Sequence, residues 1–220
     1  FVKENSDVLL QVPIPLSTGA SANSPYINAG QITNKGFETS LSYSNSGDEF
    51  SYQITGTFAS VDNEVDFLGT GSQQIFGGQP THHGASATVT QAGLPVGAFY
   101  LIKTDGIFNS EEEVNAHTQN GQLIQPNAKP GDIRFIDYNN DGQIDEDDRQ
   151  YLGSPNPEFS YGLGANFAWK GFDLNLFFQG TQGNKIYNGV RQDLEGMNLE
   201  YNYAKTTLNA WTPTNQNTSI

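Results

Sequence analysis

The chain has 220 residues, of which 35% are hydrophobic, and its 24 acidic against 10 basic side chains give a net charge of −14. A surface this acidic repels phosphate backbones, so nucleic acid is a poor partner. The absence of cysteine removes disulfides, zinc-thiolate sites and thiol nucleophiles. No apolar run approaches the roughly 20 residues of a membrane-spanning helix, and abundant Gly, Phe and Tyr favour β structure.

The ends of the sequence suggest a piece of a longer polypeptide. The chain starts without Met, lacks the pattern of a signal peptide and ends in the polar stretch TPTNQNTSI. Near its start, VLLQVPIPL (8–16) contains Pro13 and Pro15, which break a ladder. We therefore expect this stretch to be extended extracellular chain rather than a strand.

The first hairpin is predicted over 37–59. Phe37, Thr39, Leu41 and Tyr43 alternate with polar residues, and after the turn SNSGDE the same period continues through Phe50, Tyr52, Ile54, Gly56 and Phe58. A period of two residues is that of a β-strand with two different faces.

A second hairpin is predicted over 159–180. Apolar residues alternate with small or polar ones from Phe159 to Trp169, and the alternation resumes at Phe172 after the dipeptide Lys170-Gly171. The tight turn between two alternating runs is typical of antiparallel strands. The second strand carries Asp173, Asn175, Phe177 and Gln179 on the face opposite its apolar residues.

Strand length favours a membrane barrel over a soluble sandwich. A strand of this length, tilted by about 45°, rises roughly 25 Å, which matches the apolar band of an outer-membrane barrel. Turn lengths agree, because such barrels have short periplasmic turns and long outer loops, and here residues 60–157 form one very long connection. Both architectures produce alternation, so a soluble, secreted β-sandwich that binds carbohydrate remains the alternative.

Within residues 60–157 a short helix is predicted at 111–116, because Ser110 and Glu113 form an S-x-x-E capping box. The three histidines, His82, His83 and His117, have no third ligand at metal spacing and are expected to face solvent. No motif for a nucleophilic serine, a phosphate loop or a dinucleotide is present, and a glycosidase carboxylate pair lacks support. The sequence therefore does not predict an enzyme.

The stretch DYNNDGQIDEDD (137–148) carries oxygen ligands at the spacing of a calcium loop. The predicted ligands are Asp137, Asn139, Asp141, Gln143, Asp145 and Asp148, with Gly142 at the bend and Ile144 as an anchor. Asp148 replaces the usual bidentate Glu, which predicts weaker binding. Because the flanks are GDIRFID and RQYLGSPNPEF rather than helices, we expect a structural Ca²⁺ that stiffens the loop, or, failing that, a solvated acidic turn.

A family resemblance follows from an ordered series of motifs. NKGFE (34–38), PVGAFY (95–100), DGIF (105–108), KPGDIRFIDYNNDGQIDEDDR (129–149), LGSPNPEFSYG (152–162) and FFQGTQGNKIYN (177–188) together resemble the SusC/RagA family of TonB-linked outer-membrane transporters. The resemblance implies a late part of a large β-barrel closed by an N-terminal plug, coupled to TonB and capped by a SusD-like surface lipoprotein. It implies import of oligosaccharides or peptides. The plug and the TonB-contacting segment are not recognisable in these residues.

The sequence thus predicts an all-β fold: a segment of a transmembrane antiparallel β-barrel in the cell outer membrane. Residues 1–220 would be a partial TonB-dependent receptor barrel, with hairpins at about 37–59 and 159–180 facing lipid. Residues 60–157 would form an extracellular loop that bears the helix and the calcium-type loop. The expected partners are the SusD-like lipoprotein, the TonB complex through other parts of the parent chain, membrane lipid, and an oligosaccharide or peptide cargo.

Overall fold

The protein is described by a computed structural model that covers residues 1–11, 26–69, 74–80, 86–197, 200, 202–216 and 218. The chain forms two compact units. The first comprises Phe1–Phe76, Val89–Ala98 and Gly153–Ile186, and the second comprises Gly77–Thr88, Phe99–Leu152 and Tyr187–Ile220.

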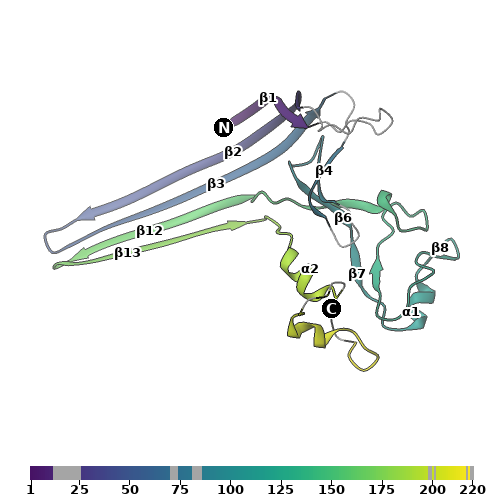
Figure 1. Ribbon diagram of the computed structural model, residues 1–220. Coiled ribbons are helices and arrows are strands. Elements are labelled where there is room, and N and C mark those ends of the chain that lie inside the picture. Colours follow the sequence, from purple (N-terminus) through teal and green to yellow (C-terminus); the bar gives the residue numbers. More distant parts are fainter. Residues whose placement is uncertain are drawn as a thin grey trace. The chain divides into compact units, whose positions relative to one another are not determined.

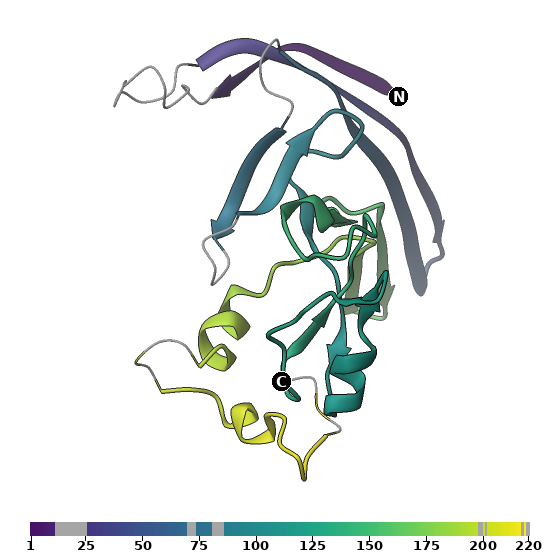
Figure 2. The ribbon, with the colours of Figure 1, turned by 90° about the vertical axis from the view of Figure 1, so that its right-hand side faces the viewer.

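The first unit contains a five-stranded antiparallel sheet of long strands (Figure 1). Its strands are β1 (Val2–Gln11), β2 (Tyr26–Ser46), β3 (Phe50–Leu68), β12 (Phe159–Trp169) and β13 (Phe172–Gln182), in the spatial order β1-β2-β3-β12-β13. β2 and β3 curve together along their length, as antiparallel ribbons with the usual strand twist do (Figure 2). The two predicted hairpins are therefore confirmed, and they lie side by side through the pairing of β3 with β12.

Three predicted boundaries differ from the structure. β2 begins at Tyr26 rather than at Phe37, and β3 continues to Leu68, so the long connection starts later than residue 60. The stretch before Phe37 was expected to be extended chain, yet Val2–Gln11 is a strand paired antiparallel with β2. This strand contains no proline, and Pro13 and Pro15 lie outside the described residues.

Both predicted tight turns lie at the same end of the sheet. In the β12–β13 turn Lys170 has φ +47° and Gly171 has φ +84°, as a type I′ turn requires. The backbone N–H of Lys170 donates to the carbonyl of Glu49 in the β2–β3 turn, over 3.3 Å. The Lys170 ammonium also pairs with the Glu49 carboxylate at 3.3 Å.

The long connection carries short elements of its own. A four-stranded sheet has the order β11-β6-β5-β4, built from β4 (Gln74–Pro80), β5 (Ser86–Gln91), β6 (Ala98–Ile102) and β11 (Arg149–Gly153). Two small pairs are β7 (Thr104–Ile107) with β10 (Ile133–Phe135) and β8 (Thr118–Gln119) with β9 (Gln122–Leu123). Helical elements are α1 (Glu111–Ala116), η2 (Glu146–Asp148), α2 (Gly189–Glu195) and η3 (Lys205–Asn209).

Few side chains are deeply buried. The first unit buries Val65, Leu68, Val89 and Ala98, close to the point where the N–H of Val65 donates to Leu94. The second unit buries Ala87, Phe108 and Val114. No helix in the described ranges is long and apolar enough to cross a membrane.

We predict that Gly36→Ala destabilises the long-stranded sheet. A Cβ at Gly36 would overlap the Ser60 carbonyl oxygen on β3 and lie 2.7 Å from the Phe1 ring. The backbone must shift to admit it, which costs about 1–3 kcal/mol. The change should lower the heat-unfolding midpoint of the full-length polypeptide, read as a gel mobility shift. Gly56→Ala on β3 is the control, because a Cβ there meets nothing within 4 Å. Equal midpoints for the two variants would contradict the prediction.

Candidate functional site

The long-stranded sheet has one apolar face and one polar face. Residues directly opposite each other in an antiparallel ladder lie on the same face. One such row, across four strands, consists of Tyr43, Ile54, Ala165 and Leu176. The adjacent row consists of Ser44, Gln53, Asn166 and Asn175. The alternation predicted within single strands is therefore in phase across β2, β3, β12 and β13.

The apolar face is exposed and has aromatic rings at both ends of its strands. Leu41 and Phe172 keep 75% and 73% of their surface accessible. Near the tight turns the rings of Phe50 and Phe167 stack with centroids 6.3 Å apart, and the Lys170 ammonium lies 5.7 Å above the Trp169 ring. At the opposite end of the same strands, Phe58 stacks on Phe159 at 5.6 Å. Aromatic rings flanking an aliphatic band are typical of strands that cross a membrane.

The polar face consists mainly of small hydroxyl and amide side chains. The Ser42 and Thr55 hydroxyls are hydrogen-bonded at 2.9 Å, and the Gln53 amide donates to Ser42 at 3.3 Å. Such a surface tolerates water, so the sheet can separate an apolar environment on one side from an aqueous one on the other.

The acidic loop is closed by its own side-chain oxygens. The N–H of Asp141 donates both to Asp137 Oδ1 at 3.2 Å and to Asn139 Oδ1 at 2.9 Å, so these two oxygens converge. The N–H of Gly142 donates to Asp137 Oδ2 at 2.8 Å. Gly142 has φ +92°, which explains why glycine occupies the bend. The spacing predicted from sequence therefore forms a compact turn.

Asp148 closes this loop from its far end. Its side chain is fully buried, and its Oδ1 accepts from the N–H of Tyr138 at 2.8 Å and of Asn139 at 3.4 Å. Its Oδ2 accepts from the N–H of Asp145 at 2.9 Å. Asp148 thus ties the start of the loop to its end through backbone groups.

The other predicted ligands are less closely gathered. Asp145 Oδ1 accepts from the N–H of Asp147 at 2.8 Å, and Gln143 is exposed. Within the described residues, no group of three or more His, Asp or Glu side chains is arranged to hold a metal ion. The donors are hard oxygens of the kind that suit calcium, but several of them already accept backbone hydrogen bonds.

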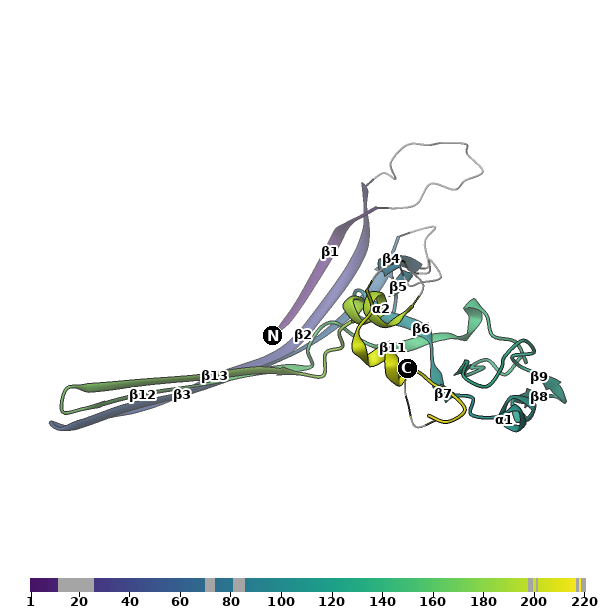
Figure 3. The ribbon, with the colours of Figure 1, turned by 60° about the horizontal axis from the view of Figure 1, so that its bottom comes forward.

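The predicted helix α1 is found where the capping pattern places it (Figure 3). The Ser110 hydroxyl accepts from the N–H of Glu113, and the Glu113 carboxylate accepts from the N–H of Asn109. A hydrogen bond from the Ser110 side chain lowers the pKa of Glu112.

The histidines and the loop aromatics differ from one another. His117 is half-buried with its ring edge-on to Phe108 at 5.4 Å, so the expectation that it faces solvent is wrong. His82 and His83 lie outside the described residues. Phe108 is fully buried, and Arg134 lies over its ring at 5.9 Å while pairing with Asp105 at 3.1 Å. Phe108 therefore belongs to the core of the second unit.

Sequence reasoning did not identify the role of Trp211. Its indole N–H donates to Asn109 Oδ1 at 3.0 Å, and Gln216 donates to the Asn109 carbonyl at 3.2 Å. The indole also lies so close to Gly131 that a Cβ there would approach it to 2.7 Å. No periodic signal marks these residues, because the contact joins positions about a hundred residues apart.

Comparison with known proteins gives matches along the whole chain. TonB-dependent receptor P26 of Formosa agariphila is 32% identical over 227 residues, which cover 100% of this chain and 22% of that receptor. TonB-dependent receptor SusC of Bacteroides thetaiotaomicron is 22% identical, covering 96% of this chain and 20% of that receptor. The structure of the RagAB peptide transporter superposes with a TM-score of 0.73 at 23% identity, covering 100% of this chain and 23% of that one. No family model matches the sequence.

The two-faced sheet and these matches define a TonB-dependent receptor, a class whose members lie in the outer membrane. Within that class, the chain belongs to the SusC/RagA family. It spans about a fifth of the length of the relatives that it matches. The members of this family are transporters rather than enzymes.

We predict that Asp148→Ala loosens the acidic loop even when a chelator is present. The change leaves the buried N–H groups of Tyr138 and Asp145 without acceptors, at about 1–3 kcal/mol for each group. Amide hydrogen exchange over residues 137–148 of the full-length receptor should become faster. Asp147→Ala is the control, because Asp147 is exposed and its side chain makes none of these bonds. Equal exchange in the two variants would argue against the role assigned to Asp148.

Proposed function

We propose that the chain forms part of the barrel wall of a nutrient importer that takes up oligosaccharides or peptides. The observation that carries this proposal is the in-phase, two-faced sheet of membrane-length strands with its exposed apolar face. The apolar face contacts lipid, and the polar face lines the lumen. Moving one exposed Leu or Phe side chain from water into hydrocarbon contributes about 1.5–3 kcal/mol, so the exposed face strongly favours the membrane.

The direction of the strands follows from their turns. Short turns lie on the periplasmic side of such barrels, which places Glu49 and Lys170 there. The long connection before β12 and the segment after β13 are then extracellular. In that position they help to shape the outer vestibule and contact a SusD-like surface lipoprotein. The TonB complex contacts parts of the receptor outside these residues.

A soluble β-sandwich is the less favoured candidate. A sandwich buries its apolar face against a second sheet at about 10 Å, whereas here residues such as Leu41, Phe172 and Phe178 are accessible. The match to TonB-dependent receptors over the full chain also favours a barrel.

The acidic loop is assigned to a structural Ca²⁺, with Asp137, Asn139, Asp141, Gln143, Asp145 and Asp148 as ligands. Support comes from the ligand spacing, from the convergence of Asp137 and Asn139 on one N–H, and from Gly142 at the bend. When bound, the ion neutralises mutual repulsion among the carboxylates. The protein's own part is to hold the loop closed through Asp148.

We predict opposite accessibility for two adjacent positions on β13. Leu174 lies on the apolar face and Asn175 on the polar face. These 220 residues contain no cysteine, so single substitutions, Leu174→Cys and Asn175→Cys, introduce defined labelling sites. In outer-membrane vesicles a charged, water-soluble maleimide should label the receptor at position 175 and leave position 174 unlabelled. Equal labelling of both, or full solubility of the receptor without detergent, would contradict the barrel.

We predict that removing Ca²⁺ exposes the loop to protease. Free calcium at about 100 times the dissociation constant would stabilise the closed loop by about 2.7 kcal/mol. Limited proteolysis of the full-length receptor, with cleavage sites read by mass spectrometry, should show faster cutting within 137–148 after chelation. In Asp137→Asn the loop should be cut equally fast with and without calcium. Asp147→Asn should behave like the unchanged receptor, and protease resistance that is insensitive to chelator would remove calcium from the proposal.

A further inference from the structure

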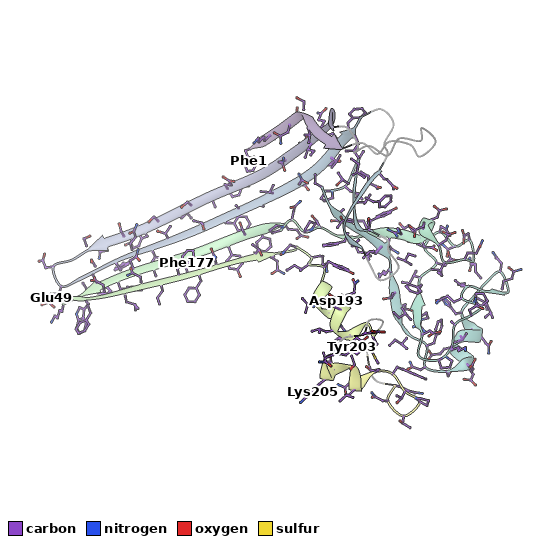
Figure 4. All side chains as sticks on the ribbon, in the orientation of Figure 1. Phe1, Glu49, Phe177, Asp193, Tyr203 and Lys205 are labelled. Carbon is purple, nitrogen blue, oxygen red and sulfur yellow. The ribbon has the colours of Figure 1, made fainter. Side chains whose placement is uncertain are left out.

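The polar face of the long strands contains one aromatic residue. Within the described positions 38–46, 51–59, 160–168 and 173–181, this face consists of Ser, Thr, Gly, Ala, Asn and Gln with two acids, and Phe177 is its single large apolar side chain. Phe177 lies midway along β13 (Figure 4). Its row consists of Ser42, Thr55, Gly164 and Phe177.

The Phe177 ring is not used to pack the sheet. It keeps 70% of its surface accessible. Its cross-strand partner is Gly164, and a Cβ at Gly164 would meet only the Thr55 carbonyl, at 3.9 Å. The ring therefore does not cover the glycine, and a bare strip of backbone lies beside it. An aromatic face next to an open strip can receive a flat ligand.

Uncommitted amide groups surround the ring. Asn166 and Asn175 form the next row toward the tight turns, and Gln179 is the next residue of this face on β13 in the other direction. Over the part of the chain that the structure describes, none of these three side chains has a hydrogen-bond partner. Amides both donate and accept, so they match hydroxyl groups of either orientation.

The charge of this face also selects among ligands. Glu38 and Asp173 are its charged residues in the four ranges above, and neither Lys nor Arg occurs there. An anionic ligand would find no counter-charge, and the termini of a short peptide would be matched only in part. A neutral ligand with many hydroxyl groups fits the donors and acceptors that are present.

We propose that Phe177 is a contact platform for a neutral oligosaccharide cargo on the inner wall of the barrel. The apolar C–H face of a sugar ring stacks on the aromatic face, while its hydroxyls bond to Asn166, Asn175 and Gln179. Ligand sites commonly combine an aromatic surface with a few polar groups in this way. This inference rests on the proposed import function and adds a cargo class and a residue to it.

The test uses the full-length receptor purified in detergent and one mixed probe. The probe contains short neutral malto-, cello-, xylo- and agaro-oligosaccharides together with tryptic peptides of casein, and retained molecules are identified by mass spectrometry. The unchanged receptor should retain oligosaccharides. Phe177→Ala should lower their retention about tenfold or more, and Phe177→Trp should preserve it.

Phe178→Ala is the matched control. Phe178 is the next residue, of the same type and 61% accessible, but it lies on the apolar face. It should leave oligosaccharide retention unchanged while lowering the heat-unfolding midpoint of the receptor in lipid.

Three outcomes would overturn the inference: retention of peptides alone, retention of no oligosaccharide, or equal retention by the unchanged receptor and Phe177→Ala. If Phe177→Ala lowers only the unfolding midpoint, the ring packs against another part of the receptor, which also overturns it. The labelling of positions 174 and 175 is independent of cargo, so it separates a wrong cargo class from a wrong barrel.

Discussion

Backbone pairing between β3 and β12 is the constraint on which the rest of the structure depends. The pairing runs from Phe50 opposite Trp169 to Ser60 opposite Phe159, and it joins two hairpins that are far apart in the sequence. In hydrocarbon every backbone N–H and C=O must be paired within the protein, so this ladder cannot be partly open. A slip of one residue would turn the apolar set of one hairpin toward the polar face of the other. The register therefore fixes which side chains meet lipid and which meet water.

The residues between β3 and β12 must then fold with little help from that ladder. Phe108 provides a fully buried centre in the second unit, with the His117 ring at its edge and the Arg134 guanidinium over its face. Asp148 plays a corresponding role for the acidic loop, because it satisfies backbone groups from both ends of the loop. In each case one buried side chain replaces the larger core that such a short segment cannot build.

Local patterns predicted the elements that depend on local physics. A period of two and the Lys170-Gly171 dipeptide are properties of consecutive residues, so the faces of β2, β3, β12 and β13 and both tight turns were predictable. β1 was not, because strand formation by Val2–Gln11 depends on pairing with β2 rather than on strong alternation. The short strands of the long connection have the same difficulty. For the acidic loop, spacing indicated which oxygens can converge, but not that Asp148 would be buried on three N–H groups or that His117 would pack on Phe108. Trp211 was missed because its partners, Asn109 and Gly131, are remote in sequence.

The position of Trp211 also has a consequence for the order of assembly. The residue that closes over Gly131 and bonds to Asn109 comes after β13 in the chain. A closure over about a hundred residues is unfavourable in a free chain and becomes affordable only when the intervening segment is already structured. The indole contact should therefore form late, once β12 and β13 have paired. Until then the segment around Gly131 lacks its cover, so a receptor arrested during insertion would present this segment in a state that the finished receptor never exposes.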